Sequence, residues 1–355
     1  MMKKEFILGA DVSSLLAMED CGAKYYDFDG KENNALEILK AHGMNYMRLR
    51  IWNNPLTSFD RGDYCNLENT IKIAKRIKKI GLKLLLDFHY CDTWADWKNQ
   101  PIPRKWVGQN VQQLGESIYQ YTKSVLETLY QENAYPDMVQ IGNEIGHGLL
   151  WDYGKLEQPQ NIVRFLNRGI DAVKDADTGE CRAEIMLHTE SGGNVESTEK
   201  FFQMLQEYGI KGYDVIGLSY YPYWAGDYQY LVNNMRNIKE KFGKDVIVVE
   251  TAFPYTDDSN DEMSNVVTGE LTVKEMGLLP SKENQKKVLE KVIQTVRHEE
   301  NGYGVFYWEP VWYCLKGVGV SKGLGNEWEN QALFDYNGKV LEGLRAFEIL
   351  NREEV

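Results

Sequence analysis

In the stretch Met138-Val139-Gln140-Ile141-Gly142-Asn143-Glu144-Ile145-Gly146-His147-Gly148, an Asn-Glu pair directly follows an apolar run that ends in glycine. The apolar run indicates a mostly buried strand. An ionisable glutamate at the end of such a strand is costly unless it is paired or used. Taken alone, the pair could equally leave the strand for solvent and cap the next turn.

Strand-like runs alternate with helical runs on both sides of this stretch. Eight strands are expected, over residues 6–12, 46–51, 82–87, 138–142, 183–188, 213–219, 245–249 and 304–307. The main helical runs between and after them cover 34–42, 67–80, 111–131, 160–175, 197–208, 228–242, 283–299 and 339–350. This order predicts an α/β fold: a single (β/α)8 TIM barrel over residues 1–355, with long βα loops forming a substrate cleft. A doubly wound open sheet is the alternative, but no Gly-x-Gly-x-x-Gly follows the first strand.

The charge balance limits the partners. The chain carries 53 acidic and 40 basic residues, a net charge of -13, which argues against nucleic acid and anionic membranes. No apolar stretch approaches the roughly 20 residues of a membrane span. The five cysteines lie far apart without a Cys-x-x-Cys pair, so reduced thiols are expected. We expect a monomer.

The first apolar run, residues 6–10, is shorter than the roughly 7–15 residues of a signal-peptide core. It is better interpreted as the first strand. The expectation is a cytoplasmic protein, and the alternative is a secreted one whose signal peptide has been removed.

Polar and aromatic residues gather where the expected strands end, which is where barrel enzymes place their chemistry. They include Asp11, Arg48, Arg50, His89, Asp92, Trp94, Asn143, Glu144, His188, Glu190, Tyr220, Tyr221, Glu250, Trp308 and Glu309. Tryptophan rings beside loops suit the apolar faces of sugars. The candidate stacking platforms are Trp94, Trp224, Trp308 and Trp312, of which at least one is expected only to pack.

The order of these rim residues resembles the clan A glycoside hydrolases and, within that clan, glycoside hydrolase family 53, the endo-β-1,4-galactanases. The segments that carry the resemblance are 9–14 (GADVSS), 47–52 (MRLRIW), 87–96 (DFHYCDTWAD), 140–144 (QIGNE), 217–224 (GLSYYPYW) and 249–255 (VETAFPY). Cys91, the run Trp97-Lys98-Asn99 and His147 depart from the family pattern in loops beside the cleft. These departures put substrate length or linkage preference in doubt more than reaction type.

The resemblance implies hydrolysis, with retention, of internal β-1,4-galactosidic bonds in galactan, type I arabinogalactan or derived galacto-oligosaccharides. Glu144 would be the acid/base and Glu250 the nucleophile, with the two carboxyl groups about 5–5.5 Å apart. Arg48 beside Glu250 should favour its charged form, and a drier pocket should raise the pKa of Glu144. Glu190 and Glu309 are weaker candidates, and Glu309 better fits a supporting role.

The expected substrate contacts are Arg48, His89, Asp92, Trp94, Asn143, Tyr220, Trp224, Trp308 and Trp312. Asn143 would donate to the sugar 2-hydroxyl, and Tyr220 would orient the nucleophile. No cofactor is expected to be required. The oxygen-rich loop 256–265 suggests a structural Ca²⁺ held by Asp257, Asp258, Asp261 and Asn265, although its spacing is not that of an EF-hand.

Three alternatives remain open. A metal-dependent hydrolase using His89 and His188 is disfavoured, because no His-x-His or His-Glu-x-x-His occurs. A non-catalytic galactan-binding barrel is disfavoured by the presence of both glutamates. A clan A β-1,4-glucanase or mannanase stays possible, because the sequence does not show which hydroxyl epimer the pocket accepts.

Overall fold

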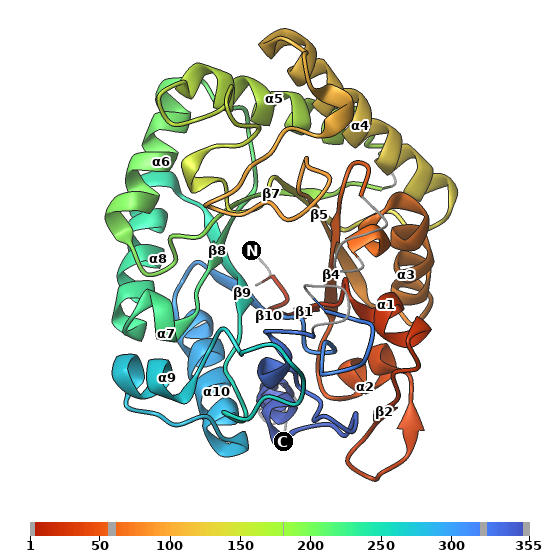
Figure 1. Ribbon diagram of the computed structural model, residues 1–355. Helices are drawn as coiled ribbons and strands as arrows, with labels where there is room; N and C mark the ends of the chain where they lie inside the picture. Colours follow the sequence, from red (N-terminus) through yellow and green to blue (C-terminus); the bar gives the residue numbers. More distant parts are fainter. Residues whose placement is uncertain (1–3, 56–61, 180, 320–324, 351–355) are drawn as a thin grey trace.

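The computed structural model describes residues 4–55, 62–179, 181–319 and 325–350. Eight parallel strands close into a barrel in the order β1-β10-β9-β8-β7-β6-β5-β4, with β4 pairing back onto β1 (Figure 1). They are β1 (Ile7–Asp11), β4 (Tyr46–Ile51), β5 (Lys83–Phe88), β6 (Met138–Ile141), β7 (Glu184–Thr189), β8 (Val215–Ser219), β9 (Asp245–Thr251) and β10 (Gly302–Trp308). The predicted TIM barrel is confirmed.

The barrel interior is apolar toward the amino-terminal ends of the strands. All eight strands contribute to one buried cluster: Ile7, Tyr46, Leu85, Met138, Met186, Val215, Ile247, Val249 and Phe306. Gly9 makes room for the Phe306 ring, since a Cβ at Gly9 would lie 2.4 Å from it. Because this apolar cluster fills the amino-terminal end of the barrel, the polar side chains gather at the carboxyl ends of the strands.

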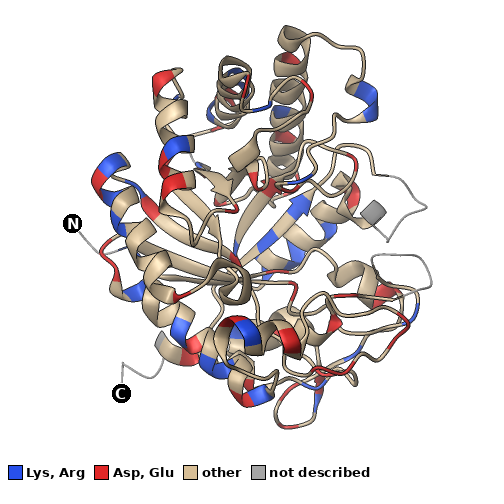
Figure 2. Cartoon of the chain, turned by 60° about the vertical axis from the view of Figure 1, so that its left-hand side comes forward, with Lys and Arg blue, Asp and Glu red and all other residues tan. Residues whose placement is uncertain are grey.

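Helices surround the strands (Figure 1). They are α2 (Ala35–Ala41), α3 (Leu67–Lys79), α4 (Val111–Gln131), α5 (Pro159–Asp175), α6 (Val195–Glu207), α8 (Tyr228–Phe242) and α10 (Lys282–His298). Asparagine side chains cap the first turns of α2, α3, α4 and α6, which explains where these helices begin. Acidic and basic residues are mixed over the helices (Figure 2). Within the described ranges, no helix combines the length and apolarity needed to cross a membrane.

Several short elements were not predicted, because each is too brief to show a hydrophobic period. They are α1 (Leu15–Asp20), the hairpin β2 (Tyr25–Tyr26) and β3 (Glu32–Asn33), α7 (Pro222–Ala225), α9 (Gly269–Met276), and the 3₁₀ turns η1 (Gly62–Cys65), η2 (Arg104–Trp106), η3 (Ile145–His147) and η4 (Glu329–Gln331). The helix predicted over 339–350 is the 3₁₀ helix η5 (Glu342–Leu350), which begins three residues later than predicted.

Candidate active site

Glu144 and Glu250 meet at one hydroxyl group in the barrel mouth. Ser219, the last residue of β8, donates to Oε1 of Glu144 at 2.7 Å, and its hydroxyl lies 3.4 Å from Oε2 of Glu250. Because both contacts share one atom, the two carboxylate oxygens cannot be farther apart than these two lengths together. Ser219 was not predicted as a site residue, although its position at a strand end beside Tyr220 was a usable signal.

The backbone at Glu144 is unusual. Glu144 follows β6 with φ 48° and ψ 51°, a left-handed conformation that is uncommon for a residue with a side chain. Gly142, two residues earlier, also has a positive φ of 80°. Such conformations are typical of functional sites, where surrounding contacts hold them. The turn places the Glu144 carboxyl beside Ser219.

Glu250 is held from two sides. Nη1 of Arg48 donates to Oε1 at 2.8 Å, and the hydroxyl of Tyr221 donates to Oε2 at 3.2 Å. The expectation that Tyr220 orients Glu250 was wrong. The hydroxyl of Tyr220 donates instead to the backbone carbonyl of Gly226 at 2.7 Å, since neighbouring residues at this strand end point in different directions.

Arg48 is almost wholly buried, and its guanidinium connects the buried polar side chains around Glu250. Its guanidinium contacts Asp11 at 3.1 Å, Asp87 at 2.8 Å, and the Asn143 side-chain oxygen at 2.8 Å. Asn143 in turn donates from Nδ2 to the carbonyl of Ala95 at 2.9 Å. The amide of Asn143 is therefore fixed in orientation, with one N–H of Nδ2 committed to Ala95.

The surroundings set the protonation of the carboxyl groups. Burial raises the pKa of Glu144 well above its usual value, the charge of Glu250 raises it further, and the hydrogen bond from Ser219 lowers it. Burial also raises the pKa of Glu250, and Arg48 opposes that shift without cancelling it. His188 lies 2.9 Å from Ser219 through Nε2, and burial and the Arg48 charge hold the pKa of His188 well below its usual value. A neutral histidine therefore supports the serine.

His89 and Asp92 have internal partners. Nε2 of His89 lies 3.0 Å from Asp87, and Nδ1 accepts from the indole of Trp52 at 3.3 Å. The Asp92 carboxylate accepts from the backbone nitrogens of Asn54 and Arg104 at 2.9 and 2.8 Å. Asp92 thus connects the chain at Asn54 with the chain at Arg104. It was expected to contact substrate, and the structure gives its carboxylate these internal partners instead.

Five tryptophan rings in contact with one another form what we call the tryptophan wall: Trp94, Trp312, Trp308, Trp328 and Trp224. Trp94 stacks parallel to Trp312 with centroids 6.4 Å apart, and both approach Trp308 at 6.1 Å. Trp312 is only 3% exposed, so it is the candidate that packs, whereas Trp224 is 52% exposed. Trp328, which was not predicted, joins the wall 4.7 Å from Trp308 and 6.2 Å from Trp224. Its signal in the sequence was weak, because it lies far along the loop after β10.

The other two glutamates at the rim have partners of their own. Glu309 is fully buried, with Oε1 2.5 Å from Arg50 and Oε2 accepting from Ser14. These contacts give it the supporting position that was expected. Glu190 accepts from the backbone nitrogen of Gly146 at 3.2 Å and lies 3.0 Å from Nδ1 of His147.

The expected calcium ligands do not converge. Asp257 accepts from the backbone of Gly269, at the start of α9, and both oxygens of Asp261 accept backbone N–H groups. Asn265 donates to the carbonyl of Asp258 at 3.1 Å. Hydrogen bonds within the protein therefore engage Asp257, Asp261 and Asn265, and among the described residues the three candidate aspartates form no convergent group with one another.

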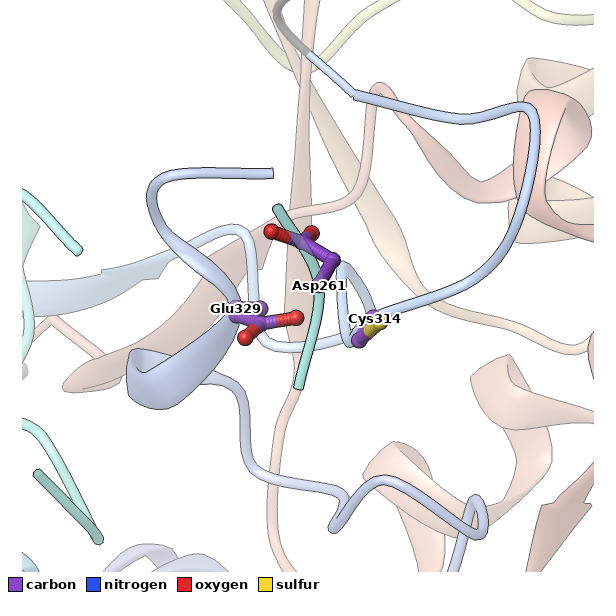
Figure 3. Close-up of side chains that lie close together, drawn as sticks. All are labelled: Asp261, Cys314 and Glu329. Atoms are coloured by element: carbon purple, nitrogen blue, oxygen red, sulfur yellow. The ribbon is translucent and has the colours of Figure 1, made fainter. Parts of the chain in front are cut away.

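Among the described residues, one group of potential metal ligands does come together in this region: Asp261, Cys314 and Glu329 (Figure 3). Their ligand atoms lie within 4.8 Å of one another. A thiol is a poor ligand for Ca²⁺, which prefers oxygen. The calcium prediction is thus not supported by the chemistry of this group.

Comparisons with known proteins identify the family of this chain. The model of glycosyl hydrolase family 53 matches residues 7–347. A probable arabinogalactan endo-β-1,4-galactanase A of Neosartorya fischeri is 36% identical over 319 residues, 88% of this chain and 86% of that protein. An arabinogalactan endo-β-1,4-galactanase of Cellvibrio japonicus is 34% identical over 343 residues, 94% of this chain and 88% of that protein. The solved GH53 catalytic domain of Ignisphaera aggregans is similar with a TM-score of 0.92 at 36% identity, covering 98% of this chain and 96% of that one.

Proposed function

The chain belongs to glycosyl hydrolase family 53 and is a glycosidase, and from that premise we propose that it cleaves internal β-1,4-galactosidic bonds by double displacement. Glu250 is the nucleophile and Glu144 the acid/base. The observation that carries the proposal is the hydroxyl of Ser219, within reach of both carboxylates at 2.7 and 3.4 Å. This arrangement supports the short carboxyl separation of retaining enzymes over the wider, roughly 6.5–9.5 Å, separation of inverting ones.

In the first step, an oxygen of Glu250 attacks the anomeric carbon while Glu144 gives its proton to the departing glycosidic oxygen. The bond from the anomeric carbon to the leaving sugar breaks, and an ester bond to Glu250 forms. In the second step, Glu144, now a carboxylate, takes a proton from water as that water attacks the anomeric carbon. The ester breaks, Glu250 returns as a carboxylate, and the product keeps its β configuration.

The protonation states suit these roles. The raised pKa of Glu144 favours the protonated acid needed for the first step. Arg48 and Tyr221 both contact Glu250, and these charge-assisted hydrogen bonds stabilise its ionised form. Asn143, fixed beside them, has an N–H available for the sugar 2-hydroxyl.

The choice of galactan rests on the relatives, two of which are named arabinogalactan endo-β-1,4-galactanases. A reducing-sugar assay on β-1,4-galactan, β-1,4-glucan and β-1,4-mannan tests it directly. Galactan is expected to be cleaved fastest. Faster release of reducing sugar from glucan or mannan would mean that the substrate assignment is wrong while the hydrolytic reaction stands. No release from any of the three polysaccharides would favour a sugar-binding protein without activity.

Azide rescue separates the two glutamates. With an aryl galactobioside as substrate, Glu144→Ala is expected to lose turnover and to regain it with azide, which intercepts the Glu250 ester and gives the β-glycosyl azide. Glu250→Ala is expected to yield the α-glycosyl azide, because azide then attacks directly. If both variants gave the same anomer, the assigned roles would be wrong.

A further inference from the structure

Trp97 and His147 come from different loops and meet at the rim of the barrel. Trp97 lies at the tip of a turn after β5, closed by backbone hydrogen bonds of 2.9 and 3.1 Å between Asp96 and Asn99. His147 ends η3, directly after the Glu144 turn. The two rings lie 6.1 Å apart at 41°, and Trp97 is 44% exposed. Exposed aromatic rings that lie together at the mouth of a barrel are candidates for ligand contact.

Hydrogen bonds hold the histidine ring and the loops that carry both rings in place. Glu190 binds Nδ1 of His147 at 3.0 Å and the backbone of Gly146 at 3.2 Å, which fixes the histidine ring. Gln100 ties the two loops together, since its side chain donates to the carbonyl of Asn143 at 2.8 Å and its own carbonyl accepts from the Trp151 nitrogen at 2.8 Å. The pair is thus pre-organised, as a binding platform requires.

The pair lies on the same side of the barrel mouth as the acid/base, because β5 and β6, whose following loops carry Trp97 and His147, are neighbouring strands. His147 is three residues after Glu144 and belongs to the loop that leaves β6. Trp94 of the larger tryptophan wall shares the loop after β5 with Trp97, but the rest of the wall belongs to other loops. Trp308 and Trp328 come at and after the end of β10, which pairs with β9 and so lies next to Glu250. A proton donor must touch the glycosidic oxygen, so the sugar that departs with that oxygen extends past Glu144 and away from the nucleophile.

We propose that Trp97 and His147 form the platform for the second sugar on the leaving-group side, counted from the cleaved bond, and that they thereby determine which bond of an oligosaccharide is cleaved. This assignment rests on the proposed roles of Glu144 and Glu250. The Trp97 ring offers a flat face to the apolar side of a sugar. Lys98, whose ammonium lies 4.5 Å from the Trp97 ring centroid, supplies an exposed donor for hydroxyl groups at the same place.

Cleavage mapping tests this platform. A β-1,4-galactopentaose labelled at its reducing end is digested, and the labelled products are separated by length. In Trp97→Ala, binding modes that place two or more sugars on the leaving-group side lose stabilisation, whereas the mode that places one sugar there does not. Cleavage therefore shifts toward the reducing end, and labelled galactose gains about three- to tenfold over longer labelled products. His147→Ala shifts the map in the same direction but less, and Trp97→Phe keeps the wild-type map.

Tyr208→Ala is the matched control, because Tyr208 is an aromatic residue 49% exposed at the end of α6. Its map should equal that of the wild type. A shift toward the non-reducing end, an unchanged map in Trp97→Ala, or a uniform loss of rate without a shift would each overturn the proposal. If the substrate panel favours glucan or mannan, the same map is made with that oligosaccharide, so an error in the sugar does not affect this test. An error in the roles of Glu144 and Glu250 shows separately in the azide products.

Discussion

Nη1 of Arg48 lies 2.8 Å from Oε1 of Glu250, at a place where both side chains are almost wholly buried. The same guanidinium contacts the carboxylates of Asp11 and Asp87. Three buried carboxylates therefore share this cation, although Asp11 also lies 3.4 Å from Arg50. Because an unpaired buried charge is far more costly than a paired one, Arg48 links the stability of the barrel mouth to the ionisation of Glu250.

Arg48→Ala is expected to lower the free energy of unfolding by about 3–5 kcal/mol, because it removes the guanidinium that Glu250, Asp87 and Asp11 share. Urea denaturation at neutral pH measures the loss. Arg236→Ala is the control, since Arg236 pairs with Glu299 at 2.8 Å on the exposed side of α8. That variant should unfold close to the wild type. Equal stabilities for the two variants would show that the buried cluster does not need Arg48.

Tyr221→Phe is expected to lower kcat about 10- to 100-fold, because it removes a hydrogen bond of 3.2 Å to the ionised nucleophile. Tyr220→Phe removes a hydrogen bond of 2.7 Å to the carbonyl of Gly226 instead. It should cost about 1 kcal/mol of stability and leave kcat unchanged. Steady-state kinetics and thermal unfolding of both variants check the pair. A larger loss of kcat in Tyr220→Phe would reverse the assignment that the geometry supports.

The barrel could be predicted from the sequence because its strands and helices carry strong periodic patterns. The range Tyr46–Ile51 of β4 and the range Val111–Gln131 of α4 were predicted to the residue. Glu144 and Glu250 could be named because they stand at strand ends, where a barrel collects its polar side chains.

Side-chain direction could not be predicted in the same way. Tyr220 and Tyr221 are adjacent, and the sequence pattern alone does not tell which hydroxyl reaches Glu250. Trp328 contacts Trp308 only because the loop after β10 folds back over the barrel mouth. The predicted calcium ligands are uncertain from the sequence for a related reason. The oxygens of Asp257 and Asp261 accept hydrogen bonds from nearby backbone N–H groups, and a count of acidic residues does not reveal this.

Removal of calcium is expected to leave the melting temperature unchanged. In the part of the loop after β9 that the structure describes, Asp257 and Asp261 accept backbone N–H groups and Asp258 accepts from the hydroxyl of Thr256. The group that does converge includes the thiol of Cys314. Thermal unfolding with EGTA, and again with added Ca²⁺, measures this. A melting temperature that falls with EGTA and recovers with Ca²⁺ would contradict the geometry and restore a structural calcium.

Ser219→Ala is expected to move the basic limb of the pH profile of kcat/KM to higher pH. Catalysis needs Glu144 protonated, so activity falls as pH rises through the pKa of Glu144 in the free enzyme. The hydroxyl of Ser219 donates to the Glu144 carboxylate at 2.7 Å and thereby stabilises its charged form. Without this hydrogen bond the pKa rises further, and the protonated acid persists to higher pH.

The acidic limb should move less, because Ser219 lies 3.4 Å from Glu250 while Arg48, at 2.8 Å, remains in place. Ser191→Ala is the control, since the hydroxyl of Ser191 contacts those of Thr189 and Thr198. Its pH profile should match that of the wild type. A basic limb that stays in place or moves to lower pH in Ser219→Ala would mean that the titrating group is not the carboxyl beside Ser219, and the acid/base role would then have to be assigned to another residue.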